Sequence, residues 1–135
     1  PERFRQECDR ILLIGAPVVL LWNEARISEE INLGRERIYK NYCPNFKGFS
    51  GGREGRNHAR RAFFGEEIQE QRFPNPLSYD RQTFVNRALS SSYSLIETDP
   101  DFEAYLAELG ELFDQFAVDG KIVLPQDSVV YFKGC

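Results

Sequence analysis

Two short runs of polar and aromatic residues have the types needed to hold a small polar substrate. Trp22 and Asn23 directly follow an apolar run, and the Asn side chain can both donate and accept hydrogen bonds. Ser91, Ser92 and Tyr93 end a Ser-Ser-Ser-Tyr run and carry hydroxyls with the same double capacity. These five residues are the candidates for contact with a substrate.

Both runs also have an ordinary structural interpretation. Trp22 could belong to a core and Asn23 could start a turn, while serines commonly end helices by bonding to the backbone. The serine run lacks the Gly-x-Ser-x-Gly context of a nucleophile elbow. Because the one histidine, His58, lies in a Gly-rich segment, a Ser-His-Asp arrangement is disfavoured. The sequence therefore assigns no catalytic residue.

A third cluster is basic and rich in glycine. Residues 46–61 contain four glycines and show little apolar periodicity, which predicts a long flexible loop. The segment has none of the spacings of phosphate-binding loops. A solvated loop is the first expectation, and a loop that binds an anion or closes over a substrate is the alternative. Its cationic side chains are Lys47, Arg53, Arg56, Arg60 and Arg61.

Composition limits the classes of function. A net charge of -4 and a pI near 5.1 disfavour a nucleic-acid partner held by phosphate contacts. The apolar stretch at residues 11–22 is interrupted by glycine and proline and falls short of the ~20 residues that span a bilayer. Three cysteines, Cys8, Cys43 and Cys135, indicate neither a disulfide framework nor a zinc site. We expect a cytoplasmic protein without a metal, a nucleic-acid partner or a membrane anchor.

The element that positions Trp22 is predicted to be a buried strand. Residues 17–22 are apolar without alternation, which is typical of a strand covered on both faces in a parallel sheet. Residues 1–15 have the pattern of an amphipathic helix with one stripe facing a core, and Gly15 is placed to end it. Ligands bind at the carboxyl ends of parallel strands, so Trp22 and Asn23 are well placed for a site.

The remaining elements follow from caps and periodicity. Residues 67–73 indicate an edge strand, and residues 121–124 and 129–133 a closing hairpin or one bent strand. Three helices are expected, one capped by Ser28 and ending near Tyr42, one capped by Ser78 before the serine run, and one capped by Asp99 with an aromatic core stripe from Phe102 to Phe116.

The order of these elements predicts the fold class. A helix, a Gly turn and a two-sided strand form the second half of a β-α-β unit whose first strand is absent from the sequence. The chain also begins at Pro1 and contains no Met, which favours a fragment. We therefore expect one α/β domain over residues 1–135, the second half of a Rossmann-like sheet, with the basic loop 46–61 within it.

Three segments in chain order resemble class I S-adenosylmethionine-dependent methyltransferases of the small-molecule type. Arg10-Ile-Leu-Leu-Ile-Gly-Ala-Pro-Val-Val-Leu-Leu-Trp-Asn resembles the helix, turn and fifth strand of that family. Phe84-Val-Asn-Arg-Ala-Leu-Ser-Ser-Ser-Tyr resembles its segment with a Ser-x-Ser-Tyr end, and Asp119-Gly-Lys-Ile-Val-Leu with Val129-Val-Tyr-Phe-Lys-Gly resembles its final strand region. The resemblance implies strands five to seven with their flanking helices. The family's glycine-rich turn and acidic residue, which bind the cofactor, have no counterpart in this sequence.

The resemblance also implies a function. The parent enzyme would transfer a methyl group from S-adenosylmethionine to a nucleophilic small molecule. Trp22 and Asn23 would lie near the methyl donor or the acceptor, and Ser91, Ser92 and Tyr93 on the acceptor side. Without the cofactor motif, the chain alone is expected to be inactive.

A non-catalytic interaction module is the alternative from a different class. The apolar strand at residues 17–22 would then pair across a dimer interface, because a strand with unpaired edges invites association. Under both hypotheses the isolated chain is expected to self-associate through this strand. A third hypothesis is an anion-binding protein that uses Arg53, Arg56 and Arg60.

Overall fold

The computed structural model of the chain describes residues 2–49 and 53–133, with side chains except at 53–56. These residues form a mixed α/β fold with a three-stranded antiparallel sheet, in the order β1-β5-β2, and a two-stranded sheet of β3 and β4. In chain order the elements are α1 (Glu2–Ile11), β1 (Val19–Ala25), α2 (Glu30–Tyr42), α3 (Arg53–Phe64), β2 (Ile68–Pro74), β3 (Leu77–Tyr79), α4 (Arg81–Leu89), α5 (Phe102–Phe116), β4 (Ile122–Leu124) and β5 (Gln126–Lys133).

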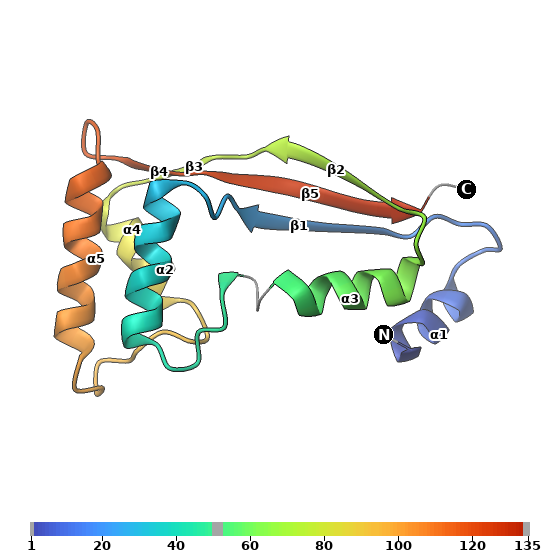
Figure 1. Cartoon of the computed structure of the whole chain (residues 1–135), viewed down its shortest axis with the longest axis horizontal. Helices are drawn as coiled ribbons and strands as arrows, with labels where there is room; N and C mark the ends of the chain where they lie inside the picture. Colours follow the sequence, from blue (N-terminus) through green and yellow to red (C-terminus); the bar gives the residue numbers. More distant parts are fainter. Residues whose placement is uncertain (1, 50–52, 134–135) are drawn as a thin grey trace.

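The main sheet is built around the last strand of the chain. β5 lies between β1 and β2 and is antiparallel to both, so β1 and β2 run in the same direction (Figure 1). Asn23 pairs with Ser128, and Ser128 pairs with Phe73 on its other side. The expectation that residues 17–22 form a strand of a parallel sheet is therefore wrong for the described residues, since the neighbour of β1 is antiparallel.

The strand expected to be buried on both faces is also more exposed than predicted. Val19 is 56% and Leu21 62% exposed, because β1 lies at one edge of the sheet and no described element covers their face. Side chains alternate across a strand, and the opposite face is covered. There, Phe64 of α3 packs with Val129 and Tyr131 of β5, and α3 lies along this face (Figure 1).

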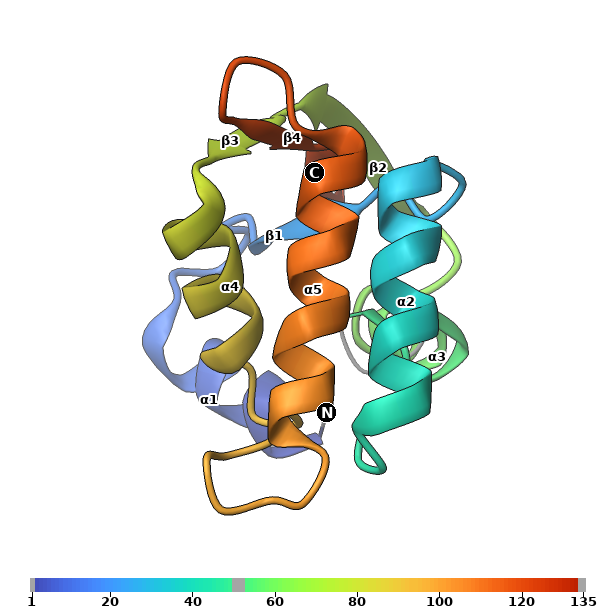
Figure 2. The same cartoon turned by 90° about the vertical axis from the view of Figure 1, so that its left-hand side faces the viewer.

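Three helices form the larger core at the other end of the molecule. α2, α4 and α5 stand side by side (Figure 2), and Tyr39, Tyr105 and Leu109 between them are fully buried or nearly so. Ile122 and Leu124 of β4 join this core. The aromatic stripe predicted for the helix of residues 102–116 is confirmed, since Phe102, Tyr105, Leu109 and Phe113 are buried on α5.

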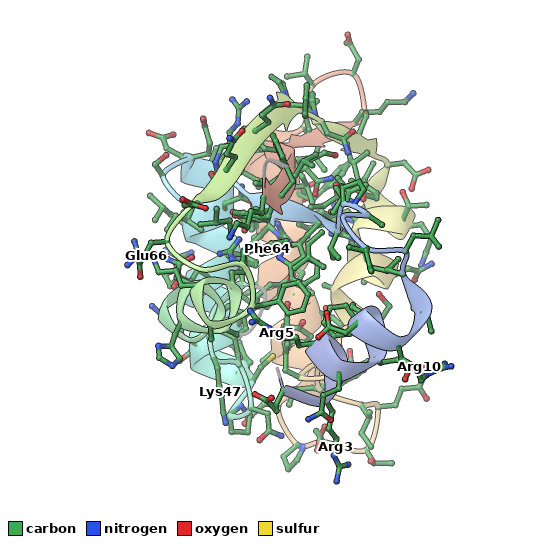
Figure 3. All side chains as sticks on the ribbon, turned by 90° about the vertical axis from the view of Figure 1, so that its right-hand side faces the viewer. Arg3, Arg5, Arg10, Lys47, Phe64 and Glu66 are labelled. Carbon is green, nitrogen blue, oxygen red and sulfur yellow. The ribbon has the colours of Figure 1, made fainter. Side chains whose placement is uncertain are left out.

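The N-terminal helix is confirmed, but the core predicted beneath its stripe is not there. α1 ends at Ile11 rather than at Gly15, and none of its described residues is buried. Its apolar side packs on α3 instead, where the ring centroids of Phe4 and Phe63 lie 5.1 Å apart. Figure 3 shows Arg5 between the two helices, and its guanidinium donates to the carbonyl of Ala62 at 3.3 Å.

The basic segment predicted as a loop is largely helical. α3 occupies residues 53–64, so only the part from residue 46 to 49 is described as irregular, and residues 50–52 lie outside the described residues. The buried side of α3 carries Arg60 and Phe64. Four glycines suggested a loop, and Gly55 among them lies within α3, so packing against the sheet outweighs its low helix propensity.

Three predicted helix caps are shifted by the structure. The residue before α2 is Glu29 rather than Ser28, and α5 begins after Asp101, two residues beyond the predicted cap. Ser78 lies in β3. The cap of α4 is Asp80, whose carboxylate accepts a hydrogen bond from the Thr83 amide at 2.8 Å, as expected of an N-cap aspartate.

The last two strands form one bent strand rather than a hairpin. Only Pro125 separates β4 from β5, and the two pair with different partners. The predicted edge strand at residues 67–73 is confirmed as β2. None of the helices in the described parts of the chain has the length and apolar character needed to cross a membrane.

Candidate functional site

A small cavity brings two of the predicted segments together. Asn23 of β1 and Ser91 and Tyr93 of the loop after α4 line the same cavity of about 170 Å³. It lies where β1 and β5 approach the helical core. The other described lining residues are Ala25, Arg35, Phe49, Arg87, Ser90, Leu124, Pro125 and Gln126.

Asn23 holds a defined place in this cavity, although it does not end the strand. β1 continues for two residues beyond it, to Ala25. The Asn23 side-chain oxygen accepts a hydrogen bond from the Ser128 hydroxyl at 2.8 Å, and the Asn75 amide lies 3.4 Å from the same oxygen. Its oxygen is therefore anchored by two neighbouring side chains.

The two other predicted site residues do not line the cavity. Trp22 precedes Asn23 in the strand, so its side chain lies on the opposite face of the sheet. Ser92 is exposed, whereas its neighbour Ser91 faces the cavity. The site thus keeps three of the five predicted residues: Asn23, Ser91 and Tyr93.

Arg35 is the most informative lining residue that sequence reasoning missed. It lies on α2, is 7% exposed, and stacks on Phe49 with its guanidinium carbon 4.9 Å from the ring centroid. Its Nη1 donates to the Asn32 side-chain oxygen at 2.8 Å. Helical spacing could have found it, because Arg35 lies four residues after Ile31 and three before Ile38, both of which are buried.

Two residues that line the cavity each have a buried side-chain nitrogen without a hydrogen-bond partner among the described residues. The nitrogens are Nε of Arg35 and the side-chain amide nitrogen of Gln126. Gln126 is 6% exposed and lies at the start of β5. A buried donor without a partner costs about 1–3 kcal/mol, so two of them beside one cavity make it the leading candidate for a binding site.

Comparison of the sequence with protein-family models and with curated proteins gave no match. The function therefore has to be inferred from the chemistry of the site.

The cavity is electropositive and rich in donors. Arg35 and Arg87 contribute two positive charges, and no Asp or Glu occurs among its described lining residues. Burial raises the pKa of the Tyr93 phenol above its ordinary value, so this hydroxyl stays protonated at neutral pH and can donate. Such a surface suits oxygen atoms that carry negative charge or accept hydrogen bonds.

The cofactor implied by the resemblance does not fit these residues. Pockets for ligands of that size usually measure about 300–1,000 Å³, and this cavity holds about 170 Å³. Its described lining also has no carboxylate that could bind ribose hydroxyls. The cavity therefore has room for a small ligand or for one end of a larger one.

A buried ion cluster lies on the opposite face of the sheet. The Glu24 carboxylate accepts hydrogen bonds from Arg72 at 3.1 Å and from the Tyr131 hydroxyl at 3.1 Å, and Nη1 of Arg60 lies 3.4 Å away. The Arg60 guanidinium also stacks 3.8 Å above the Tyr131 ring. Arg60 thus holds α3 to the sheet, which contradicts its predicted role in anion binding, and the side chains of Arg53 and Arg56 lie outside the described residues.

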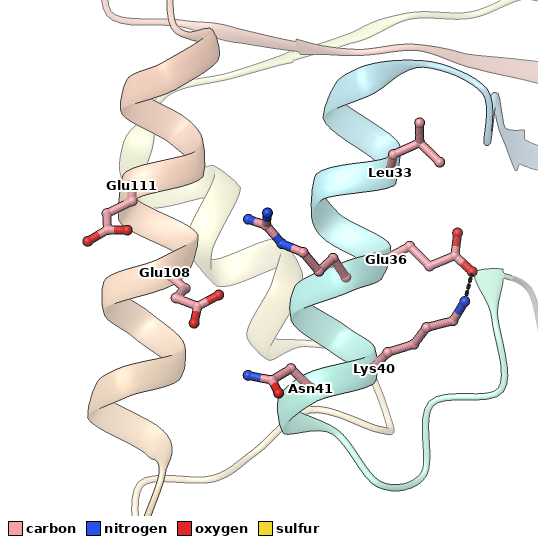
Figure 4. A pocket seen from close by; sticks show the side chains of 7 residues that line it. Leu33, Glu36, Lys40, Asn41, Glu108 and Glu111 are labelled. Carbon is pink, nitrogen blue, oxygen red and sulfur yellow. Dashed lines mark ion pairs between the residues drawn. The ribbon is translucent and has the colours of Figure 1, made fainter.

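A larger groove runs between α2 and α5 but has the character of an ordinary surface. Figure 4 shows Glu108 and Glu111 on α5 and Glu36 and Lys40 on α2, with the Glu36 and Lys40 side chains pointing away from α5. Lys40 pairs with Glu36 at 2.8 Å along the helix, as exposed charges at this spacing commonly do. The groove measures about 900 Å³, and its mixed charges favour solvation over a specific ligand.

The described residues show neither a candidate metal site nor a disulfide. They contain no group of three or more metal-binding side chains. Cys8 and Cys43 are free thiols, and Cys135 lies outside the described residues. Burial raises the pKa of the Cys43 thiol, which disfavours its reactive thiolate form.

Proposed function

We propose that this chain forms the acceptor-binding part of a cytoplasmic S-adenosylmethionine-dependent methyltransferase that modifies a small molecule. The chain alone is inactive under this proposal, because the glycine-rich turn and the acidic residue that such enzymes use for the cofactor have no counterpart in its sequence.

One observation carries the proposal. Asn23 belongs to the Trp-Asn segment of the resemblance, and Ser91 and Tyr93 belong to its serine-tyrosine run. The two segments are far apart in the sequence, yet these three residues line one cavity. Chance similarity of two separate segments gives no reason for their residues to meet.

The sheet offers a second point of support. β1 and β2 run parallel on either side of β5, and the three make a sheet with flanking helices; the proposed second half of a methyltransferase would also consist of three strands with flanking helices. Among the described residues, no strand pairs with the outer edge of β1. A further strand could pair there and continue the sheet.

Methyl transfer requires few catalytic side chains. Methyl transfer depends on holding the acceptor and the donor in line, and positioning alone can lower a barrier by about 7–11 kcal/mol in favourable systems. The donors around the cavity would hold and orient the acceptor. No general base is assigned among these residues.

The test is a calorimetric titration with S-adenosylmethionine. Two proteins are compared, this chain and the same chain extended by the upstream reading frame. Binding by the longer protein alone supports the proposal. Binding by neither contradicts it and favours an interaction module.

The interaction module is the second candidate, and a specific observation favours it. Leu13, Ile14, Val19 and Leu21 are exposed apolar residues before and within the edge strand β1. Contiguous exposed apolar surface is typical of sites for protein contact. If the module is correct, the chain forms a defined dimer that no upstream segment alters, and light scattering of the two proteins decides between the candidates.

A further inference from the structure

We propose that the cavity lined by Asn23, Arg35, Ser91, Tyr93 and Gln126 binds the carboxylate group of a small organic acid. The inference rests on the proposed function only where it identifies this acid as the methyl acceptor. Binding itself depends on the cavity alone.

The charge and hydrogen-bonding capacity of the cavity select an anion. Two arginines, Arg35 and Arg87, line it without a carboxylate among its described neighbours, although the whole chain carries a net charge of -4. The attraction is therefore local. A protonated Tyr93 and the Ser91 hydroxyl add donors that an anionic oxygen accepts.

Two buried donors beside the cavity lack a partner and could turn toward such an oxygen. The Arg35 Nε and the Gln126 side-chain nitrogen have no hydrogen-bond partner among the described residues. Both residues are more than nine-tenths buried, whereas Asn23, Arg87 and Ser90 are exposed at the open side of the cavity. Both nitrogens are buried rather than open to the cavity, so both side chains would adjust on binding to donate, which would recover the free energy of their desolvation.

The shape and the remaining lining favour a carboxylate on a short hydrocarbon chain. A volume of about 170 Å³ corresponds to roughly five or six water-sized groups. Most of the exposed lining is polar, and Ala25, Phe49, Leu124 and Pro125 supply smaller apolar walls. A carboxylate can meet the donors while its methylene groups contact these walls, whereas a phosphate has no apolar part to place there.

The test is an NMR titration of the ¹⁵N-labelled chain with butyrate, without any cofactor. We expect saturable shifts of the Arg35 Nε–H and Gln126 side-chain amide signals, with a Kd of about 1 mM because the ligand has few atoms. Butyramide has nearly the same size without the charge and should give no saturable shift. Inorganic phosphate should bind more weakly than butyrate.

Two variants complete the design. Gln126→Glu is nearly isosteric and places a like charge at the site, so we expect affinity for butyrate to fall by about tenfold or more. Arg37→Met is the control. Arg37 lies on α2, as Arg35 does, but lines the groove between α2 and α5, so its replacement should leave butyrate binding unchanged. The spectrum of each variant also reports whether it is folded.

The possible results distinguish the carboxylate site from the methyltransferase proposal. Saturable butyrate binding that Gln126→Glu weakens supports the proposal, whatever the cofactor titration gives. Equal binding of butyramide, or phosphate binding as strong as butyrate, overturns the carboxylate assignment. Absence of saturable shifts with butyrate overturns the site itself and leaves the methyltransferase proposal to its own test.

Discussion

Tyr105 shows how one buried hydroxyl ties the stability of the helical core to pH. Its ring is fully buried between α2 and α5, and its hydroxyl accepts a hydrogen bond from Ser94 at 3.3 Å. Burial raises the pKa of this phenol far above its ordinary value, and it raises the pKa of Tyr131 in the same direction. The neutral form is therefore favoured in the folded protein.

The raised pKa of Tyr105 predicts how the stability of the folded chain depends on pH. Unfolded tyrosine ionises near pH 10, so the stabilisation is complete below that pH and is lost as pH rises toward the folded pKa. We expect the free energy of unfolding in urea to fall between about pH 9 and pH 11. Tyr105→Phe cannot ionise and should show a shallower fall. An equal slope for both proteins would contradict the role of Tyr105.

Adjacent serines provide the sharpest test of which residues face the ligand. Ser91 lines the cavity and Ser92 is exposed. In the NMR titration, Ser91→Ala should weaken butyrate binding by about tenfold or more, the value of one hydrogen bond to a charged group. Ser92→Ala is the matched control and should bind as the unsubstituted chain does. The reverse order would remove Ser91 from the site.

Under the proposed function, Asn23 is tested in the chain extended by its upstream reading frame rather than in the isolated chain. Its side chain combines an anchored oxygen, bonded to Ser128, with a position on the cavity wall. We expect Asn23→Ala to lower kcat/KM by about tenfold, because one oriented hydrogen bond contributes about that much. Unchanged turnover and substrate binding would exclude Asn23 from the site.

At the scale of residues, sequence reasoning found the polar types but not their directions. Asn23, Ser91 and Tyr93 were predicted and share a cavity, while Trp22 and Ser92 differ from their neighbours only in the side to which they point. A strand alternates its side chains, so correct placement of Asn23 requires Trp22 to face away. Which of the two faces the cavity depends on the helices that pack there, and these come from distant parts of the chain.

At the scale of elements, α3 was missed because its stabilisation is tertiary. Its N-terminal residues follow two glycines and show little apolar periodicity, so local signals favoured a loop. In the structure, Arg60 contacts Glu24 and stacks on Tyr131. A helix can form on such contacts even where its own propensity is low.

The ion cluster beneath α3 gives a stability prediction. Glu24→Gln removes the charge that faces the buried guanidinium of Arg60, and breaking a buried pair costs about 3–5 kcal/mol. We expect a loss of about 3 kcal/mol in urea unfolding, since the amide can still accept a hydrogen bond. Glu70→Gln is the control, because Glu70 pairs with Arg72 at the surface and such pairs contribute less than about 1 kcal/mol.

Two helical glycines make a matched pair for the packing of α5. A Cβ on Gly34 of α2 would lie 2.5 Å from Cδ1 of the buried Leu112, whereas a Cβ on Gly110 would meet only the flexible end of Arg81. Overpacking costs about 1–3 kcal/mol, and alanine gains about 1 kcal/mol in helix propensity. We therefore expect Gly34→Ala to destabilise the chain by about 1 kcal/mol and Gly110→Ala to stabilise it by up to about 1 kcal/mol in urea unfolding. Two variants of equal stability would contradict close contact between α2 and α5.

At the scale of the whole molecule, periodicity predicted most elements and not their assembly. The helices at residues 2–11, 30–42, 81–89 and 102–116 and the strand at 68–74 follow from local patterns. The antiparallel insertion of β5 between β1 and β2 does not, because an apolar run has the same pattern in either direction. Register and direction are set by pairing between segments more than 50 residues apart in the chain.

The same assembly leaves the molecule with an incompletely covered sheet. Leu21 lies at the open edge on the uncovered face and is 62% exposed, and unpaired strand edges favour association. We expect the isolated chain to form dimers or larger species at micromolar concentration in light scattering. Leu21→Lys places a charge where natural proteins use one to prevent pairing, so it should shift the distribution toward monomer. Val123→Lys changes another exposed apolar strand residue, in the small sheet, and should have little effect. A monodisperse monomer of the unsubstituted chain would contradict association through this strand.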